Sequence, residues 1–325
     1  MKIAIYGAGA IGGWIGAGLA RSGCDVSVVA RGKTLTAIER DGLRIEQAGA
    51  VRSWRVKASA DPARLGVQDL VVVAVKAPAL AGVATQIGPL IGPKTSVLTA
   101  MNGVPWWFFE GFGGPLAGTR LEAVDPDGAI AHSIPASQVI GSVVHASCSL
   151  NAPGFVRHHF GNELIIGEPS GAKSDRVLAL AELLTQGGID APVSDRIQRD
   201  IWFKLWGNMT VNPISAFTGA TTDLILGDPL VCDFVTKVML EAKEIGARID
   251  IAIPQQPEDR HAITRKLGAF KSSMLQDVEA GRPVELDTLV TVVRELGQLT
   301  GFATPFTDAL LGLARLHARV HGLYS

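Results

Sequence analysis

The chain has 325 residues, which is enough for about two domains and a sizeable core. Its 47% hydrophobic and 19% charged residues are typical of a globular protein, and a net charge of −1 with no basic run argues against a nucleic-acid partner. The most apolar stretch, residues 70–84, is interrupted by Lys76 and Pro78 and is shorter than the ~20 residues of a bilayer span, so we expect no membrane partner.

Cysteine and histidine usage predicts a reducing compartment and no metal site. The chain has an odd number of widely spaced cysteines, as expected of free thiols in the cytoplasm: Cys24, Cys148 and Cys232. His158 and His159 lack the spacing of metal ligands. The first twenty residues have the small apolar character of a signal peptide, but their many glycines have a better explanation.

That explanation is a dinucleotide-binding turn at residues 7–12, between a strand at 2–6 and a helix that ends near Ser22. A second strand follows at 25–30, which is the context that makes a GxGxxG motif meaningful. Gly7 permits the tight turn, Gly9 lets the backbone approach a pyrophosphate, and Gly12 lets helix and strand pack closely. The helix N-terminus then offers free N–H groups to the phosphates. The predicted cofactor-binding residues here are Gly7, Ala8, Gly9, Ala10, Ile11 and Gly12.

The end of the second strand indicates which dinucleotide binds. An acid there would bind the ribose 2′-hydroxyl of NAD, but the chain has Arg31, followed by Lys33. An arginine can bind a 2′-phosphate through two hydrogen bonds, so Arg31 predicts NADP(H). A solvated loop charge is the simpler alternative for this residue.

Two further buried strands are predicted at residues 70–75 and 95–99, and their lack of polar alternation is typical of a parallel sheet. Lys76 ends the first and Asn102 follows the second, at the strand ends where such sheets bind ligands. A surface charge and an Asx turn before Gly103 are the structural alternatives. Strands separated by helices predict a doubly wound α/β domain of Rossmann type.

The remaining elements divide into a sheet extension and a helical region. Runs at 138–149 and 163–167 are expected to be mostly antiparallel strands, followed by a helix at 174–186 and a strand at 189–193. After residue 194 the pattern is helical, so we predict an NADP-binding domain at 1–194 and an all-α substrate domain at 195–325. The expected helices are 195–210, 229–250, 261–280, 285–300 and 304–321.

Three polar residues recur on the first of these helices, where Lys204, Asn208 and Asn212 stand at i, i+4 and i+8 on one face. Their neighbours are largely apolar, so these groups need polar partners, and a polar ligand is one candidate. The alternative is a core helix with a snorkelling lysine.

A second polar group lies further along the chain. Gly281 and Pro283 break the helical pattern between Ser273 and Glu285, so both side chains can face a common cleft. Spacing alone is weak evidence, since an acid in a first helical turn is also favoured by the helix dipole.

Together these blocks resemble the ketopantoate (2-dehydropantoate 2-) reductase family over nearly the whole chain. The blocks occur in the family's order: the glycine fingerprint ending in Arg31, Lys76, Asn102-Gly103, Lys204…Asn208…Asn212, and Ser273…Glu285, with residues 161–168 similar to the family's sheet region. The resemblance implies NADP(H) as cofactor and Lys204 and Glu285 as catalytic residues, with Lys204 the general acid. It implies that Asn102, Asn208, Asn212 and Ser273 bind the substrate, and that Lys76 and Asn102 lie near the nicotinamide ribose.

The segment after Asn102 departs from the compact members of the family, because residues 106–112 contain five aromatic side chains. They form either a small core of an insertion or a pocket wall for a larger, more apolar 2-oxo acid. We therefore expect NADPH-dependent reduction of 2-dehydropantoate to pantoate, with two alternatives: a reductase of another 2-oxo acid, and a non-catalytic NADP(H) sensor. Helical second domains of this kind often bury surface against a twin, so a homodimer is a further expectation.

Overall fold

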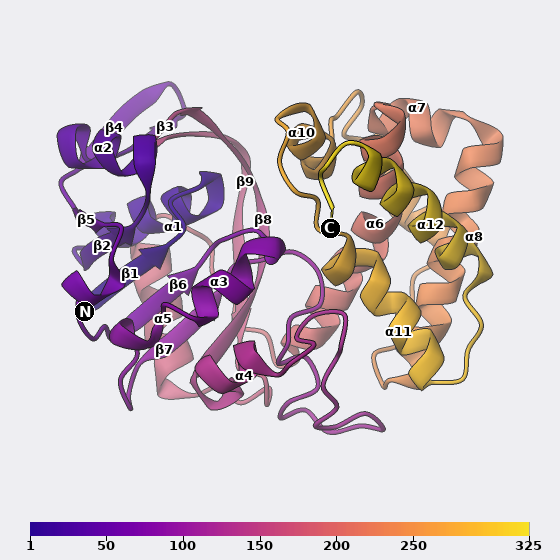
Figure 1. Cartoon of the computed structure of the whole chain (residues 1–325), viewed down its shortest axis with the longest axis horizontal. Coiled ribbons are helices and arrows are strands. Elements are labelled where there is room, and N and C mark those ends of the chain that lie inside the picture. Colours follow the sequence, from indigo (N-terminus) through magenta and orange to yellow (C-terminus); the bar gives the residue numbers. More distant parts are fainter. Residues whose placement is uncertain (325) are drawn as a thin grey trace. The chain divides into compact units, whose positions relative to one another are not determined.

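The computed structural model describes residues 1–324, which form two compact units (Figure 1). The first, residues 1–101, 110–112 and 128–200, holds a mixed sheet with helices. The second holds residues 102–109, 113–127 and the chain from Ile201 onward, and its regular structure is helical. The predicted class, a Rossmann-type α/β sheet followed by an all-α region, is confirmed. The second unit also takes two segments from the stretch that the sequence assigned to residues 1–194.

The sheet of the first unit has nine strands in the order β4-β3-β9-β8-β7-β6-β1-β2-β5. From β5 to β8 all neighbours are parallel, whereas β8 pairs with β9 and β3 with β4 in antiparallel fashion. In chain order the strands are β1 (Lys2–Tyr6), β2 (Asp25–Val29), β3 (Leu43–Gln47), β4 (Ala50–Trp54), β5 (Lys57–Ser59), β6 (Leu70–Val73), β7 (Ser96–Thr99), β8 (Val139–Ala152) and β9 (Phe155–Gly167).

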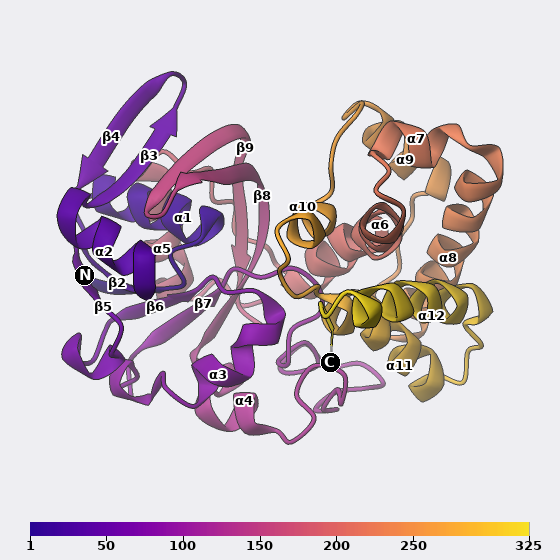
Figure 2. The same ribbon diagram turned by 45° about the horizontal axis from the view of Figure 1, so that its top comes forward.

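The central strands are buried on both faces, which is typical of parallel strands. All four residues of β6 and of β7 are buried, as expected when helices cover both faces of a sheet. Helices α1 (Ala10–Arg21) and α5 (Asp175–Gln186) pack on one face, while α3 (Leu80–Ala84) and α4 (Ala129–Ser133) lie together on the other (Figure 2). The predicted strands at 2–6, 25–30, 70–75 and 95–99 are therefore confirmed within one or two residues.

Two features of the sheet differ from the prediction. The hairpin of β3 and β4 turns through Ala48 and Gly49, both with positive φ, and this Ala-Gly pair lacks the Asn-Gly signal that would have revealed it. The predicted strand at 189–193 is wrong, since only isolated bridges join Asp190 to Glu163 and Val193 to Ile166. Pro192 lies inside this run and has no N–H to donate to a ladder.

The helical unit is built around α6 (Ile197–Thr218), which Figure 2 shows end-on with the other helices around it. The prediction ended this helix at 210, but it continues through Pro213. Within residues 1–324, no helix is both long and apolar enough to cross a membrane. The other helical segments are α7 (Thr222–Gly227), α8 (Pro229–Arg248), α9 (Pro257–Arg265), α10 (Ser273–Glu279), η5 (Asp287–Thr291), α11 (Val292–Leu299) and α12 (Pro305–Val320).

The predicted helix at 261–280 is wrong, because α9 and α10 are separate. Gly268 has a φ of +62°, which ends helical geometry, and the Ser272 hydroxyl accepts a hydrogen bond from the Leu275 N–H to begin α10. The predicted helix at 285–300 begins with the π-helical segment Asp287–Thr291 before α11 continues it. Such π turns are rare and often occur at functional sites.

Four of the five aromatic residues after Asn102 belong to the helical unit, whereas Phe112 belongs to the sheet unit. Trp107, Phe108 and Phe109 are at most 1% exposed, and the rings of Phe108 and Trp202 lie 6.2 Å apart. Nearby, the Glu295 carboxylate accepts the N–H groups of Glu122 and Ala123, which fixes the following loop to α11. These contacts favour the structural interpretation of the aromatic residues over a pocket wall.

Candidate active site

The turn between β1 and α1 has the geometry that the glycine motif predicts. Gly7 has a φ of +102°, and a Cβ on Gly12 would lie 2.0 Å from the Gly7 carbonyl oxygen, so neither position accepts a side chain without strain. A Cβ on Gly9, in contrast, would meet nothing within 4 Å, which leaves open space beside the backbone where a pyrophosphate can approach. Gly9 is the N-cap of α1, and no side chain caps its first N–H groups.

Arg31 is held at the end of the sheet by a glutamine that the sequence did not reveal. Its Nη2 donates to Gln86 Oε1 at 3.0 Å, and the hydroxyl of Tyr6, the last residue of β1, donates to the same oxygen at 3.4 Å. Arg31 is exposed and is the N-cap of α2 (Gly32–Asp41). It is thus an exposed cation fixed near the carboxyl end of β1.

Lys76 follows the carboxyl end of β6, beside the glycine turn. It is exposed and follows Val75, whose side chain, with the Ala74 carbonyl, packs within 3 Å of where a Gly7 Cβ would be. The first unit therefore gathers the predicted cofactor-binding residues at one end of its parallel strands, with the exception of Asn102, which belongs to the helical unit.

The helical unit joins two predicted residues directly, since Lys204 Nζ donates to Asn102 Oδ1 at 2.9 Å across 102 positions of sequence. Both side chains are partly buried. Asn208 is partly buried and Asn212 is 7% exposed on the same face of α6. The face thus carries one cation and two amides among apolar side chains.

The backbone beside Asn102 is fixed by Thr288 of the π-helical segment. The Val104 N–H donates to the Thr288 carbonyl at 2.9 Å, and a Cβ on Gly103, whose φ is +83°, would lie 2.3 Å from that carbonyl oxygen. Glycine is therefore required next to Asn102. Thr288 is 5% exposed, and its hydroxyl has no hydrogen-bond partner among the described residues.

Ser273 and Glu285 occupy the two ends of the break that the sequence indicated. Ser273 is the first residue of α10 and partly buried, whereas Glu285 precedes the π-helical segment and is only 5% exposed. Both belong to the helical unit, together with Asn102, Lys204, Asn208 and Asn212. A buried carboxylate, a partly buried lysine and several neutral donors are suited to bind a polar substrate and move a proton.

Comparison with known proteins identifies the family of the chain. Family models described as "Ketopantoate reductase PanE/ApbA" and its C-terminal domain match residues 3–109 and 196–318. A 2-dehydropantoate 2-reductase of Mesorhizobium japonicum is 49% identical over the full length of both chains. The chain belongs to the ketopantoate reductase family.

Solved structures support the same assignment. A Ralstonia solanacearum protein provisionally described as a ketopantoate reductase is 56% identical, with 99% of each chain covered and a TM-score of 0.95. A PanE/ApbA family ketopantoate reductase of Ralstonia eutropha is 27% identical, with 99% and 100% covered and a TM-score of 0.85. The expected family and an oxidoreductase of this type are thereby confirmed.

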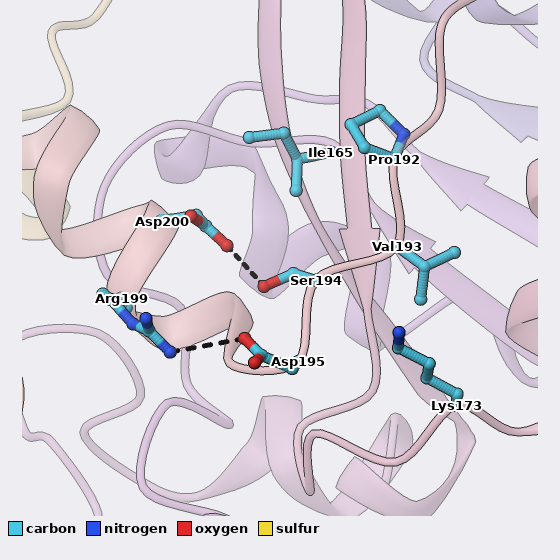
Figure 3. A pocket seen from close by; sticks show the side chains of 8 residues that line it. All are labelled: Ile165, Lys173, Pro192, Val193, Ser194, Asp195, Arg199 and Asp200. Carbon is cyan, nitrogen blue, oxygen red and sulfur yellow. Dashed lines mark hydrogen bonds and ion pairs between the residues drawn. The ribbon is translucent and has the colours of Figure 1, made fainter.

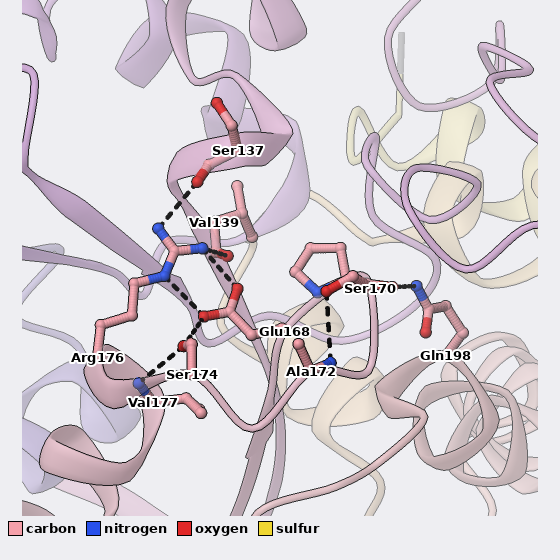
Figure 4. Close-up of polar contacts among 10 residues, drawn as sticks. Ser137, Val139, Glu168, Ser170, Ala172, Ser174, Arg176, Val177 and Gln198 are labelled. Carbon is pink, nitrogen blue, oxygen red and sulfur yellow. Dashed lines mark hydrogen bonds and ion pairs between the residues drawn. The ribbon is translucent and has the colours of Figure 1, made fainter.

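Residues 161–168, which resemble the sheet region of the ketopantoate reductases, end in the hydrogen-bonded carboxylate of Glu168. This carboxylate is 5% exposed and accepts hydrogen bonds from Arg176 and Ser174, while Arg176 also donates to the carbonyls of Ser137 and Val139 (Figure 4). Burial acts to raise the pKa of Glu168, but the bonds from Arg176 and Ser174 lower it overall. The arrangement ties α5 to β8.

A separate pocket of about 350 Å³ lies in the sheet unit and includes none of the predicted site residues. Ile165, Lys173, Pro192, Val193, Ser194, Asp195, Arg199 and Asp200 line it (Figure 3). Inside it, Ser194 donates a hydrogen bond to Asp200, and burial raises the pKa of the Asp200 carboxyl. Both basic and acidic side chains line this pocket, and Arg199 forms an ion pair with Asp195.

Gln86 and Thr288 were missed because no local pattern marks them. Gln86 lies 55 positions from Arg31, and Thr288 lies far along the chain from Gly103, so only the folded backbone brings each pair together. The glycine at 103 was the one available signal, because a glycine next to a proposed site residue suggests close backbone approach.

Proposed function

We propose that this member of the ketopantoate reductase family reduces 2-dehydropantoate to pantoate with NADPH. The observation that carries the proposal is the hydrogen bond from Lys204 Nζ to Asn102 Oδ1, which holds a lysine on a polar face of an otherwise apolar helix. The name of the 49% identical relative supports the substrate. The open space at Gly9 and the uncapped N-terminus of α1 fit a dinucleotide pyrophosphate.

Arg31 supports NADP(H) rather than NAD(H). Its exposed guanidinium replaces the acid that would bind a ribose 2′-hydroxyl, and its bond to Gln86 leaves further N–H donors for a 2′-phosphate. Lys33, on the first turn of α2, adds a second cation. Lys76 is the candidate for the nicotinamide side of the cofactor.

In the proposed reaction, the cofactor supplies a hydride to the ketone carbon of the substrate. Lys204 donates a proton to the ketone oxygen, so that the alkoxide charge is neutralised as it develops. Asn102 orients the Lys204 ammonium through their hydrogen bond. Glu285 binds the substrate hydroxyl or assists Lys204, and Asn208, Asn212 and Ser273 bind the hydroxyl and carboxylate.

The test is an assay of purified protein with NADPH and 2-dehydropantoate, in which absorbance at the NADPH band should fall only when both are present. If 2-dehydropantoate fails and another branched 2-oxo acid is reduced, the enzyme is a reductase of that acid. If NADPH binds but no 2-oxo acid supports turnover, the protein is an NADP(H) sensor. Either result would overturn the proposal.

A further inference from the structure

We propose that Arg260, on α9, is an anion-binding residue that holds the carboxylate of the 2-oxo acid substrate. The inference rests on the proposed function for the identity of the substrate, but the anion site itself can be tested separately. Arg260 belongs to none of the motifs above. Its helix packs against α7 and α8, and its side chain reaches the α6 backbone at Gly207.

The first observation is that Arg260 is a partly buried cation without a counter-charge. Its Nε is buried without a hydrogen-bond partner, and within residues 1–324 the structure gives its guanidinium neither a hydrogen bond nor an ion pair. Burial lowers the pKa of Arg260. An isolated charge removed from water is costly, so buried arginines normally have an acidic partner. The Phe203 ring, 5.2 Å from the guanidinium carbon, offsets only part of this cost.

The second observation is where the guanidinium lies. A Cβ on Gly207 would be 2.6 Å from Arg260 Nε and 3.0 Å from Nη2, so the guanidinium rests on the α6 backbone at Gly207. Gly207 is three positions after Lys204 and precedes Asn208, and residues three apart on a helix are surface neighbours. Arg260 is therefore within about one helical turn of the proposed general acid.

The third observation is that this side of α6 is open to a ligand. Phe203, Lys204 and Asn208 are only partly buried, whereas Gly207 between them is buried beneath the guanidinium. Neither Nη atom of Arg260 is among the buried polar atoms that lack a partner, so both tips remain accessible while Nε is covered. Such a fork is suited to bind a carboxylate through two parallel hydrogen bonds.

Chemistry then favours a carboxylate as the ligand. A 2-oxo acid has a ketone oxygen, for which Lys204 is the proposed partner, and an adjacent carboxylate with a full negative charge. The residues so far proposed for the carboxylate, Asn208, Asn212 and Ser273, are neutral. Arg260 supplies the missing positive charge beside Lys204, and this explains both its lack of an acidic partner and the glycine at position 207.

The test compares 2-dehydropantoate with its neutral lactone as substrates of Arg260→Met, Arg260→Lys and Gly207→Ala. We expect Arg260→Met to raise KM for the acid about 10- to 100-fold with little change for the lactone, because hydrogen bonds to charged groups have this strength. Arg260→Lys should restore part of the loss. Gly207→Ala should reproduce it by displacing the guanidinium, since the three atoms nearest its new Cβ all belong to the end of this flexible side chain.

Arg248 provides a matched control, since it also lies over a phenylalanine ring but is paired with Glu244. Arg248→Met should leave both KM values unchanged. Equal losses for acid and lactone in Arg260→Met, or an acid KM within about twofold of the wild type, would overturn the proposal in favour of a structural role.

A binding measurement separates this proposal from the assigned reaction. Oxamate, an unreactive 2-oxo acid mimic, should raise the Tm of the NADPH-saturated wild type but not that of Arg260→Met. If the wild type does not reduce 2-dehydropantoate but shows this oxamate difference, the proposed function fails and the anion site stands. If oxamate has the same effect on both proteins, the anion site is wrong whatever the activity.

Discussion

Lys204 and Asn102 are joined by a hydrogen bond of 2.9 Å between the ammonium and the side-chain carbonyl, although 102 positions separate them in the sequence. The bond connects the centre of α6 with the chain segment that follows β7. It uses one of the three ammonium donors of the lysine. The lysine is thereby oriented before any ligand binds.

Loss of the ammonium should remove turnover without removing the cofactor. Lys204→Ala is expected to lower kcat about 10²- to 10⁴-fold, the usual contribution of a general acid, while the Kd for NADPH changes little. Steady-state kinetics and fluorescence titration with NADPH measure the two effects. Lys243→Ala, which removes a lysine bonded to the Gln255 carbonyl, serves as the control. A near-normal kcat for Lys204→Ala would exclude its assigned role.

The hydrogen bond itself can be measured by a double-mutant cycle. Asn102→Ala should lower kcat in the wild-type background about 10- to 100-fold, because a hydrogen bond to a charged group contributes about 1.5–3 kcal/mol. In the Lys204→Ala background the same change should have almost no further effect, since residues that act as a unit are not additive. Additive losses would mean that Asn102 acts independently of the lysine.

Arg31 should decide between the two nicotinamide cofactors. Arg31→Asp is expected to lower kcat/KM for NADPH and to raise it for NADH, because a carboxylate repels a 2′-phosphate and can bind a ribose hydroxyl. Gln86→Leu should weaken NADPH binding in the same direction but less, since it only frees the guanidinium. An unchanged NADPH/NADH ratio in Arg31→Asp contradicts the predicted contact.

Gly103 should tolerate no side chain. Gly103→Ala is expected to lower the free energy of unfolding by more than the ~1–2 kcal/mol that a left-handed backbone alone costs an L-residue, because its Cβ would lie 2.3 Å from the Thr288 carbonyl oxygen. Gly301 has a φ of +65°, and a Cβ there would meet nothing within 4 Å, so Gly301→Ala measures the backbone cost alone. Urea unfolding of both variants tests the difference, and equal losses would refute the close approach.

The Glu168–Arg176 pair predicts a specific loss of stability in acid. The pKa of Glu168 is lowered in the folded protein. The ionised carboxylate therefore contributes its full stabilisation of the fold above the unfolded pKa of about 4.3, and this stabilisation is lost as the pH falls through the folded pKa. Glu168→Gln should therefore destabilise the protein by about 2 kcal/mol at pH 7, and this difference should shrink below about pH 4. Glu182→Gln, on the exposed surface of α5, is the control. A pH-independent difference would contradict the ionic interaction.

Much of the sheet unit could be predicted because its strongest signals are local. The strands β1, β2, β6 and β7 are short, largely apolar runs, and the glycine turn after β1 has a fixed spacing. The residues of α6 were equally visible, since Lys204, Asn208 and Asn212 follow helical periodicity. In each case neighbours in sequence were enough to define the structure.

Features that depend on distant contacts could not be predicted. The strand predicted at 189–193 is not formed as a regular strand. The local sequence pattern does not show that the ladder would need an N–H from Pro192, which proline lacks. The bond of Arg31 to Gln86 and the Thr288 carbonyl beneath Gly103 arise from packing across long stretches of chain. The composition of the site could thus be predicted, but the groups that orient it could not.

The buried aromatic segment has a consequence for how the protein can be divided. The chain passes between the two compact units at residues 101/102, 109/110, 112/113, 127/128 and 200/201, so no single cut separates them. A fragment ending at residue 194 would retain Trp107 and Phe108 but lose Trp202, and would expose these rings to water. Expression of either half alone should give aggregation-prone material, whereas a nick in the exposed loop at residues 113–118 leaves both cores intact.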